Sequence, residues 1–214
     1  MKIGVFDSGI GGQSVANAIT VALPDNQVVF RYDSEHFPYS QRSPEELVGF
    51  VVPILHGLVN DGCEVIVIAC NTVSTTIVNM LRDAVAVPLI AIEPMIKPAA
   101  VLSKTKVIAV CATPTTLASQ RYAWLKETYA QNIKVLEPDC SDWSYLIEHN
   151  QLDESKISTR LNDALEQGAD VIVLGCTHYH WIETEVNAIA AGRAQVIQPE
   201  TAIVEQLIRV MGNL

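Results

Sequence analysis

The sequence predicts an α/β protein made of two pseudo-symmetric lobes with mainly parallel sheets. Short apolar runs rich in Val and Ile alternate with helix-length segments along the chain, which is the pattern of strand–helix–strand units. One such unit also occurs twice. The segment "NDGCEVIVIACNT" at 60–72 and the segment "EQGADVIVLGCTH" at 166–178 align without a gap, and in both an acid, a strand and a cysteine follow a glycine. This repeat predicts two related lobes.

The expected strands are apolar without interruption, as in parallel sheets that helices cover on both faces. In the first half of the chain they fall at 2–6, 27–31, 64–68 and 87–92, and in the second half at 106–110, 133–137, 170–174 and 194–198.

The expected helices lie between these strands. They are the segments 11–22, 44–60, 71–84, 114–130, 153–167 and 200–211. Pro53 should kink or split the segment 44–60, because proline lacks an N–H group and its ring clashes with the preceding turn.

Two prolines interrupt the pattern in "IEPMIKPAA" at 92–100, which sets the boundary between the lobes there. We expect an N-terminal lobe of residues 1–95 plus 199–214 and a C-terminal lobe of residues 96–198. The active site is expected in the cleft between them, since ligands of parallel α/β sheets bind at the carboxyl ends of the strands.

Composition limits the partners. The 214 residues carry a formal net charge of −10, a field that would repel a nucleic-acid backbone. The apolar runs are much shorter than the roughly 20 residues that a membrane span needs. The chain opens with "MKIGVF", which has the pattern of a strand rather than a signal peptide, so we expect a cytoplasmic protein.

Two of the five cysteines occupy matching places in the repeat, namely Cys70 and Cys176. Each comes just after a strand and just before an expected helix start, where a thiol tends to ionise more readily. Cys63, Cys111 and Cys140 can be explained as small apolar residues. The sequence has no C-x-x-C spacing, so neither a zinc site nor any other metal site is expected.

Uncharged hydrogen-bonding residues gather at the same strand ends. Asn71 and Thr72 follow the first of the two cysteines, and Thr177 and His178 follow the second. The end of the first strand supplies Asp7 and Ser8, and the end of the fifth supplies Thr113, Thr115 and Thr116. The glycine-rich turn after Ser8 has no P-loop lysine, so it gives only a weak indication of nucleotide binding.

Two thiols on opposite walls of one cleft can invert a stereocentre without a cofactor. One thiolate removes a proton from one face of a carbon, and the other thiol returns a proton to the opposite face. A hydrolase built on cysteine and histidine would need only one thiol and would leave the second unexplained.

The motifs "FDSGIGGQSV", "SEHFPYSQRSPEEL", "ACNTVS", "IEPMIKPAA", "ATPTTLASQRY", "CSDWSYLIE" and "GCTHYH" resemble, in order, those of glutamate racemases of the cofactor-independent aspartate/glutamate racemase superfamily. The resemblance implies that Cys70 is the base for D-glutamate and Cys176 the base for L-glutamate. Asp7 would assist Cys70, and His178, steered by Glu148, would assist Cys176. The implied substrate shell consists of Ser8, Pro38, Tyr39, Ser40, Asn71, Thr72, Thr113, Thr116 and Thr177.

The same resemblance implies glutamate as the small-molecule substrate, D-glutamate for peptidoglycan as the product, no cofactor, and an assembly that could be a homodimer. One departure is Ser40, which stands where the family has glycine and could restrict the backbone of the substrate loop. Two alternatives stay open: a racemase of aspartate or another amino acid, and a catalytically silent binding protein. The other four histidines, His36, His56, His149 and His180, receive no role and are expected at the surface.

Overall fold

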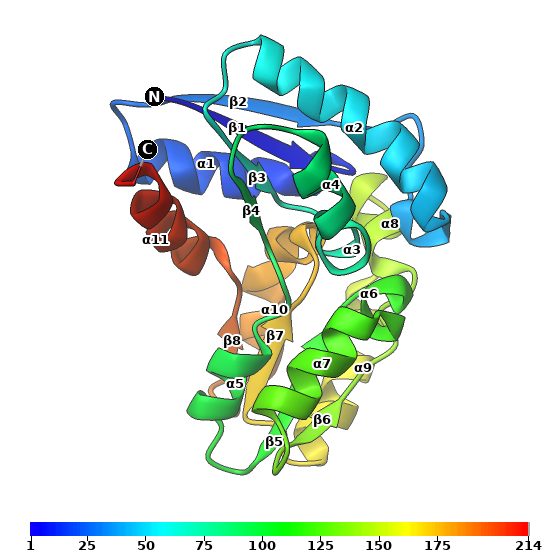
Figure 1. The fold of residues 1–214 in the computed structure, drawn as a ribbon. Coiled ribbons are helices and arrows are strands. Elements are labelled where there is room, and N and C mark those ends of the chain that lie inside the picture. Colours follow the sequence, from blue (N-terminus) through cyan, green and yellow to red (C-terminus); the bar gives the residue numbers. More distant parts are fainter. Residues whose placement is uncertain (214) are drawn as a thin grey trace. The chain divides into compact units, whose positions relative to one another are not determined.

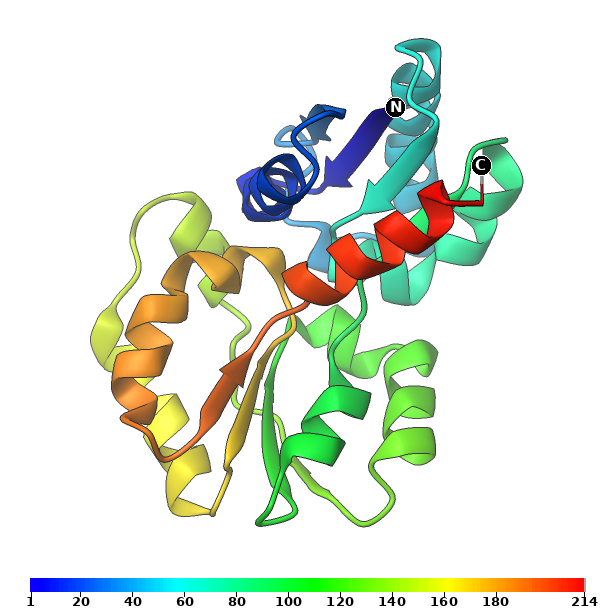
Figure 2. The ribbon, with the colours of Figure 1, turned by 90° about the vertical axis from the view of Figure 1, so that its left-hand side faces the viewer.

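The computed structural model describes residues 1–213 and shows two compact α/β units (Figures 1 and 2). The first unit comprises Met1–Glu93 together with the segment from Pro199 onward, and the second comprises Pro94–Gln198. The chain thus leaves the first unit once and returns to it with its last helix, α11 (Glu200–Met211), which packs beside α1 (Gln13–Ala22).

Each unit contains one four-stranded parallel sheet, which confirms the expected fold class. The first sheet has the order β2-β1-β3-β4 and the second the order β6-β5-β7-β8, so the two sheets share one topology. The eight predicted strands are all present, within two residues at each end. They are β1 (Lys2–Asp7), β2 (Gln27–Tyr32), β3 (Val65–Ile68), β4 (Leu89–Ala91), β5 (Val107–Cys111), β6 (Lys134–Leu136), β7 (Val171–Leu174) and β8 (Gln195–Ile197).

Helices connect the strands in both units. In the first unit, besides α1 and α11, they are η1 (Ile10–Gly12), η2 (Tyr39–Gln41), α2 (Pro44–Asn60), α3 (Asn71–Thr76) and α4 (Val78–Ala84). In the second they are α5 (Ile96–Leu102), α6 (Pro114–Ala118), α7 (Gln120–Tyr129), α8 (Trp143–Glu148), α9 (Glu154–Glu166), the 3-10 helix η3 (Thr177–Ile182) and α10 (Glu183–Ala190).

Alternate residues of each central strand enter separate cores. In β3, Val65 and Val67 pack with apolar residues of α1 and α11, whereas Ile66 and Ile68 pack with those of α2 and α4. In β7, Val171 and Val173 face the core that contains α5 and α7, whereas the alternate residues face α9 and α10. Burial on both faces explains why these strands are uninterrupted apolar runs.

The repeat seen in the sequence has a counterpart in backbone geometry. Gly62 and Gly168 end α2 and α9 with φ angles of +87° and +92°, a left-handed conformation that glycine adopts without a steric penalty. The N–H group of the residue after each glycine bonds back to a helix carbonyl, from Cys63 to Leu58 at 3.0 Å and from Ala169 to Ala164 at 3.1 Å. Both are Schellman-type helix ends, which direct the chain into β3 and β7.

Two helices predicted as continuous are each broken in two. The segment 71–84 breaks at Ile77, where the hydroxyls of Thr75 and Thr76 bond back to helix carbonyls and β-branched residues follow one another. The segment 114–130 breaks at Ser119, whose hydroxyl accepts a hydrogen bond from the N–H of Tyr122 and so caps a new helix.

Of the kink or split expected at Pro53, the split does not occur, since α2 runs unbroken through this residue. Pro53 and Gly49, the residue four positions before it, both lie at the exposed face of the helix, where water can satisfy the carbonyl that proline leaves without a donor. A capping box at Ser43 and Glu46 stabilises the helix start as well.

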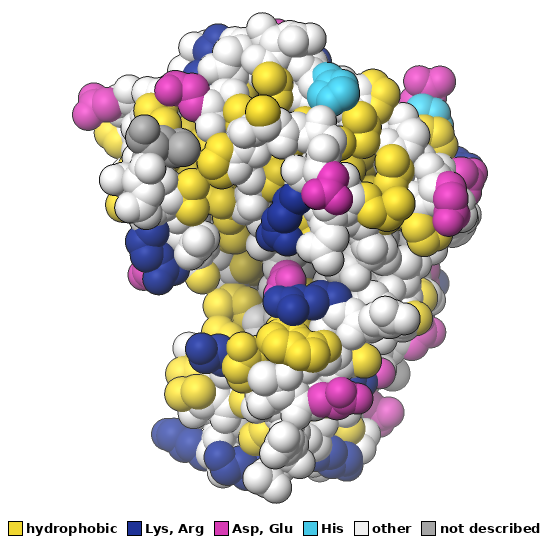
Figure 3. Space-filling view, in the orientation of Figure 1, with side chains coloured by type: hydrophobic (Ala, Val, Ile, Leu, Met, Phe, Trp, Pro, Cys, Tyr) yellow, Lys and Arg dark blue, Asp and Glu magenta, His cyan; other side chains and the backbone are white. Residues whose placement is uncertain are grey.

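On the face shown in Figure 3, acidic, basic and apolar side chains are interspersed. Across residues 1–213, no helix combines the length and apolar character that crossing a membrane requires.

Candidate functional site

Asp7 is the last residue of β1 and is fully buried. Its Oδ2 accepts a hydrogen bond of 2.6 Å from the N–H of Gly12, the residue that precedes α1. A methyl group at Gly12 would lie 2.5 Å from the Cβ of Asp7, closer than two non-bonded carbons can approach. The glycine-rich turn therefore serves to bring a helix start against this carboxylate.

We expect Gly12→Ala to lower the free energy of unfolding by about 1–3 kcal/mol, because the new methyl group must displace Asp7. Gly49→Ala is the matched control, since the position is inside α2 and, apart from the adjacent residues and the helix's own backbone, no atom lies within 4 Å of the added carbon. It should raise the free energy of unfolding by about 0.5–1 kcal/mol. Urea denaturation of both variants measures the difference, and equal effects would contradict the close approach at Gly12.

Cys70 directly precedes α3, two residues beyond the end of β3. Its sulfur lies 3.3 Å from the hydroxyl oxygen of Ser8, which itself follows β1. Asn71 is buried, yet neither its side-chain oxygen nor its nitrogen has a hydrogen-bond partner among the described residues. A buried amide of this kind is a ready pair of donor and acceptor for a bound polar ligand.

The loop after β2 carries Pro38, Tyr39 and Ser40. The Phe37–Pro38 peptide is cis, and the following three residues form η2. Ser40 does not have a positive φ, so the serine in place of the family's glycine causes no strain in this conformation. The hydroxyl of Tyr39 donates a 2.7 Å hydrogen bond to Asp33. Burial raises the pKa of Tyr39, and the bond to Asp33 and the nearby Cys70 and Asp7 raise it further.

In the second unit, a cysteine, a histidine and a glutamate form a chain of contacts. The sulfur of Cys176 lies 3.8 Å from Nδ1 of His178, whose Nε2 lies 2.5 Å from Oε2 of Glu148. His178 is only 2% exposed, so this contact is shielded from water. With Nε2–H donating to the carboxylate, Nδ1 presents its lone pair toward the thiol, as a general base requires.

The short elements that carry these groups are locked together. Glu148 is the last residue of α8, and His178 is in η3. Trp143 of α8 packs edge-on against Tyr179 of η3 at 5.3 Å between ring centroids, and the Tyr179 hydroxyl donates to the carbonyl of Cys140 at 2.8 Å. Burial raises the pKa of Tyr179 well above its usual value, so it stays a neutral donor.

Three threonines of the expected substrate shell also lie in this unit, and all are buried. The Thr113 hydroxyl accepts from the N–H of Thr116 and caps α6. Thr177 follows Cys176 at the start of η3.

The structure thus places the predicted residues in two groups at the carboxyl ends of the two parallel sheets. The first unit holds Asp7, Ser8, Pro38, Tyr39, Ser40, Cys70, Asn71 and Thr72, and the second holds Thr113, Thr116, Glu148, Cys176, Thr177 and His178. One expectation is only half met: an α-helix follows Cys70, but the tighter 3-10 helix follows Cys176.

Sequence reasoning missed some polar residues near these groups. Asp33 was not singled out, although it is buried and binds Tyr39. His180, expected at the surface, is buried at 8% exposure, and His36 is half-buried against Asp33. The Asp-x-x-His spacing before the Pro-Tyr pair was the available signal, because a short polar side chain often bonds to the backbone two or three residues later.

Two thiols at equivalent strand ends, each with a polar partner, are what a cofactor-independent racemase requires, and sequence comparison points to the same class of enzyme. The model of the Asp/Glu/hydantoin racemase family matches residues 12–207, and the chain belongs to this family. It is 38% identical over 213 residues to the glutamate racemase of Ralstonia pickettii, covering 98% of this chain and 76% of that protein. It is 33% identical to the glutamate racemase of Herpetosiphon aurantiacus, covering 98% and 84% of the two chains.

Solved structures give the same result. Escherichia coli glutamate racemase, in complex with L-glutamate and the activator UDP-MurNAc-Ala, superposes with a TM-score of 0.91 at 27% identity over 99% of this chain and 82% of that one. Francisella tularensis glutamate racemase, in complex with D-glutamate, has a TM-score of 0.82 at 26% identity, covering 99% and 81%. An aspartate racemase from Picrophilus torridus, with a TM-score of 0.70 and 19% identity, shares the fold.

Proposed function

We propose that this chain is a glutamate racemase that interconverts L- and D-glutamate with two thiols and no cofactor. One observation carries the proposal. Two cysteines occupy equivalent places after β3 and β7, in sheets of the same strand order, and each has polar partners from its own unit. Relatives that carry the name glutamate racemase, and structures of such enzymes with each glutamate enantiomer, support it.

In the L-to-D direction, His178 takes the proton of the Cys176 thiol, and Glu148 stabilises the imidazolium that forms. The Cys176 thiolate then removes the α-proton of L-glutamate. The Cys70 thiol donates its proton to the opposite face of the carbanion, which yields D-glutamate and a Cys70 thiolate. The D-to-L direction runs in reverse, with Cys70 as the base and Asp7 as its helper.

Hydroxyl and amide groups suit the substrate's two carboxylates. Asn71 offers a buried amide with both polar atoms available, and Ser8, Thr72, Thr113, Thr116 and Thr177 offer hydroxyls or backbone N–H groups. Such groups bind a carboxylate without placing a cation next to the catalytic thiolates. A cation there would form an ion pair with a thiolate and weaken it as a base. The Ser8 hydroxyl, 3.3 Å from the sulfur of Cys70, can also donate to that thiolate.

The direct test is optical. Purified protein without added cofactor should abolish the circular dichroism of L-glutamate and of D-glutamate, and solvent deuterium should enter the α-position as it does so. L- and D-aspartate are the comparison substrates. If aspartate lost its signal faster than glutamate, the substrate would be aspartate instead. If neither amino acid exchanged its α-proton, the chain would be a catalytically silent binding protein.

The proposal also keeps three expectations from the sequence. D-glutamate would serve peptidoglycan synthesis, the protein would work in the cytoplasm, and the assembly could be a homodimer.

A further inference from the structure

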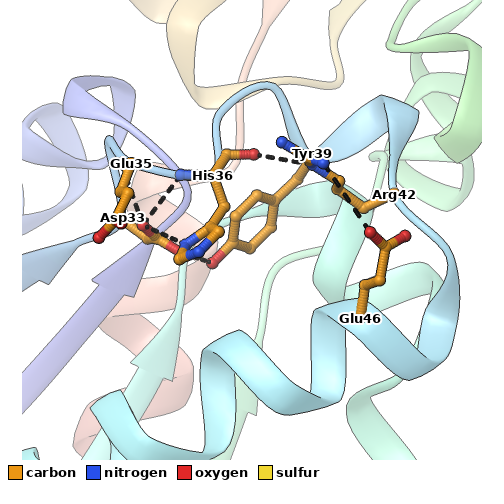
Figure 4. A network of polar contacts seen from close by, with 6 residues as sticks. All are labelled: Asp33, Glu35, His36, Tyr39, Arg42 and Glu46. Atoms are coloured by element: carbon orange, nitrogen blue, oxygen red, sulfur yellow. Dashed lines mark hydrogen bonds and ion pairs between the residues drawn. The ribbon is translucent and has the colours of Figure 1, made fainter.

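A network of polar contacts holds the loop after β2 that carries Pro38, Tyr39 and Ser40, the Tyr39 loop (Figure 4). Its centre is Asp33, a buried residue just after β2 whose N–H donates to the carbonyl of Asp7. The Asp33 carboxylate accepts hydrogen bonds from the backbone N–H groups of Glu35 and His36, at 3.2 and 3.3 Å. It also accepts from the Tyr39 hydroxyl at 2.7 Å.

His36 completes the set of donors. Its Nδ1 lies 2.8 and 3.1 Å from the two carboxylate oxygens of Asp33. Burial alone would raise the pKa of Asp33, but the hydrogen bonds from Tyr39 and His36 outweigh it and hold the pKa below its usual value. Asp33 is thus an ionised acceptor, and Nδ1 of His36 donates to it.

His36 is itself held from two sides. Its ring stacks on Phe50 of α2, with 3.7 Å between centroids and 14° between planes. Its carbonyl accepts a 3.2 Å hydrogen bond from Nε of Arg42, on the far side of the Tyr39 turn. Arg42 pairs with Glu46 of α2 at 3.8 Å. The charged side chains of this network are thus Asp33, Glu35, Arg42 and Glu46. The stack on Phe50 and the Arg42–Glu46 pair tie both ends of the loop to α2.

The same loop reaches the proposed catalytic groups. The Tyr39 ring packs 6.5 Å from that of Phe6, and Cys70 and Asp7 are near enough to contribute to the raised pKa of Tyr39. Two backbone hydrogen bonds close the turn, from the N–H of Gln41 to Pro38 and from the N–H of Arg42 to Tyr39. If Asp33 moved, the Tyr39 side chain that is bonded to it would move too, and with it the backbone of Pro38 and Ser40.

We propose that His36 is a positioning residue for substrate binding, because it fixes Asp33 and thereby holds Tyr39 and the Pro38–Ser40 backbone in place. This role rests on the proposed function, which assigns that loop to the substrate shell. His36 acts through Asp33 and Tyr39, so its loss should weaken binding of glutamate much more than it slows proton transfer.

Three variants separate this role from general packing. His36→Phe keeps a ring to stack on Phe50 but removes the donor, whereas His36→Asn keeps an N–H donor near the place of Nδ1. His56→Phe is the matched control, since His56 is an exposed histidine of α2 whose ring bonds to the carbonyl of Ala84. It should behave as wild type.

For His36→Phe we expect KM for glutamate to rise about 10-fold, with kcat changed by no more than about 2-fold. His36→Asn should recover most of the loss. In a double-mutant cycle, adding Tyr39→Phe to His36→Phe should raise KM little further, because both substitutions remove hydrogen bonds to the same carboxylate of Asp33. Equal effects of His36→Phe and His36→Asn, or additive effects in the cycle, would overturn the proposal.

A second readout does not depend on activity. Amide hydrogen exchange of Gln41 and Arg42 should become about 10-fold faster in His36→Phe and stay unchanged in His56→Phe. Unchanged exchange in His36→Phe would overturn the positioning role. A wild-type protein that racemises no glutamate would refute the proposed function, and the exchange measurement would still test the loop.

Discussion

Replacing Cys70 or Cys176 by serine is expected to lower kcat/KM for racemisation at least about 10³-fold, in both directions. Each direction uses both residues, one as base and one as acid, and a serine hydroxyl is a far weaker acid than a thiol of pKa about 8.5. The equilibrium constant between enantiomers is one, so kcat/KM for the two directions must fall together. Racemisation alone therefore cannot show which face each thiol serves.

Elimination can show it. A glutamate analogue with chlorine on the β-carbon loses chloride after one α-proton is removed, and the acid on the opposite face is then not needed. In the proposed mechanism the α-proton of the L-analogue faces Cys176, so Cys70→Ser should still process the L-analogue, and Cys176→Ser should still process the D-analogue. The measurement is chloride release for both enantiomers with both variants.

Cys63→Ser is the control for a change at a buried cysteine, since Cys63 lies in the core below β3 and has no assigned role. It should retain racemisation unless folding suffers, which circular dichroism of the protein would report. If each active-site variant lost both enantiomers equally, the two cysteines would be parts of one catalytic unit rather than face-specific bases.

Glu148→Gln is expected to lower kcat for racemisation by about 10²–10⁴-fold, the usual contribution of general acid–base catalysis. Glutamine keeps a contact with Nε2 of His178, now 2.5 Å from the carboxylate, but it removes the charge that stabilises the imidazolium. Its NH₂ group can also donate to Nε2. That would move the histidine's proton to Nδ1, which then could not accept the proton of Cys176.

The same elimination assay makes this prediction specific. With Glu148→Gln, elimination from the L-analogue should slow, because Cys176 is its proposed base, whereas elimination from the D-analogue should continue. Glu154→Gln, a change at an exposed carboxylate at the start of α9, is the control and should affect neither. Equal slowing of both analogues by Glu148→Gln would show that Glu148 acts on the whole enzyme rather than on Cys176.

The placement of the two thiols in the candidate site was predictable, because it depends on residues that are neighbours in the sequence. A thiol two residues beyond an apolar strand lies at the carboxyl end of a parallel sheet wherever the sheet packs, as with Cys70 after β3 and Cys176 after β7. The helix breaks at Ile77 and Ser119 were missed, although they too are local. There the threonine and serine hydroxyls compete with the helix for backbone groups, a choice that apolar periodicity does not record.

By itself the sequence determined the eight strands, the glycine-ended helices before the two repeated strands, and the positions of the two matching thiols. Each of these features depends on residues that are close neighbours in the sequence. Only the tertiary structure decided the strand order in each sheet and the environment of Asp33 and His36. From the sequence, His36 is expected at the surface. In the structure its position is set by the stack on Phe50, 14 positions away, and by the contact with the buried Asp33. Contacts of this kind depend on how α2 packs over β2 and β1, and no local pattern of residues specifies them.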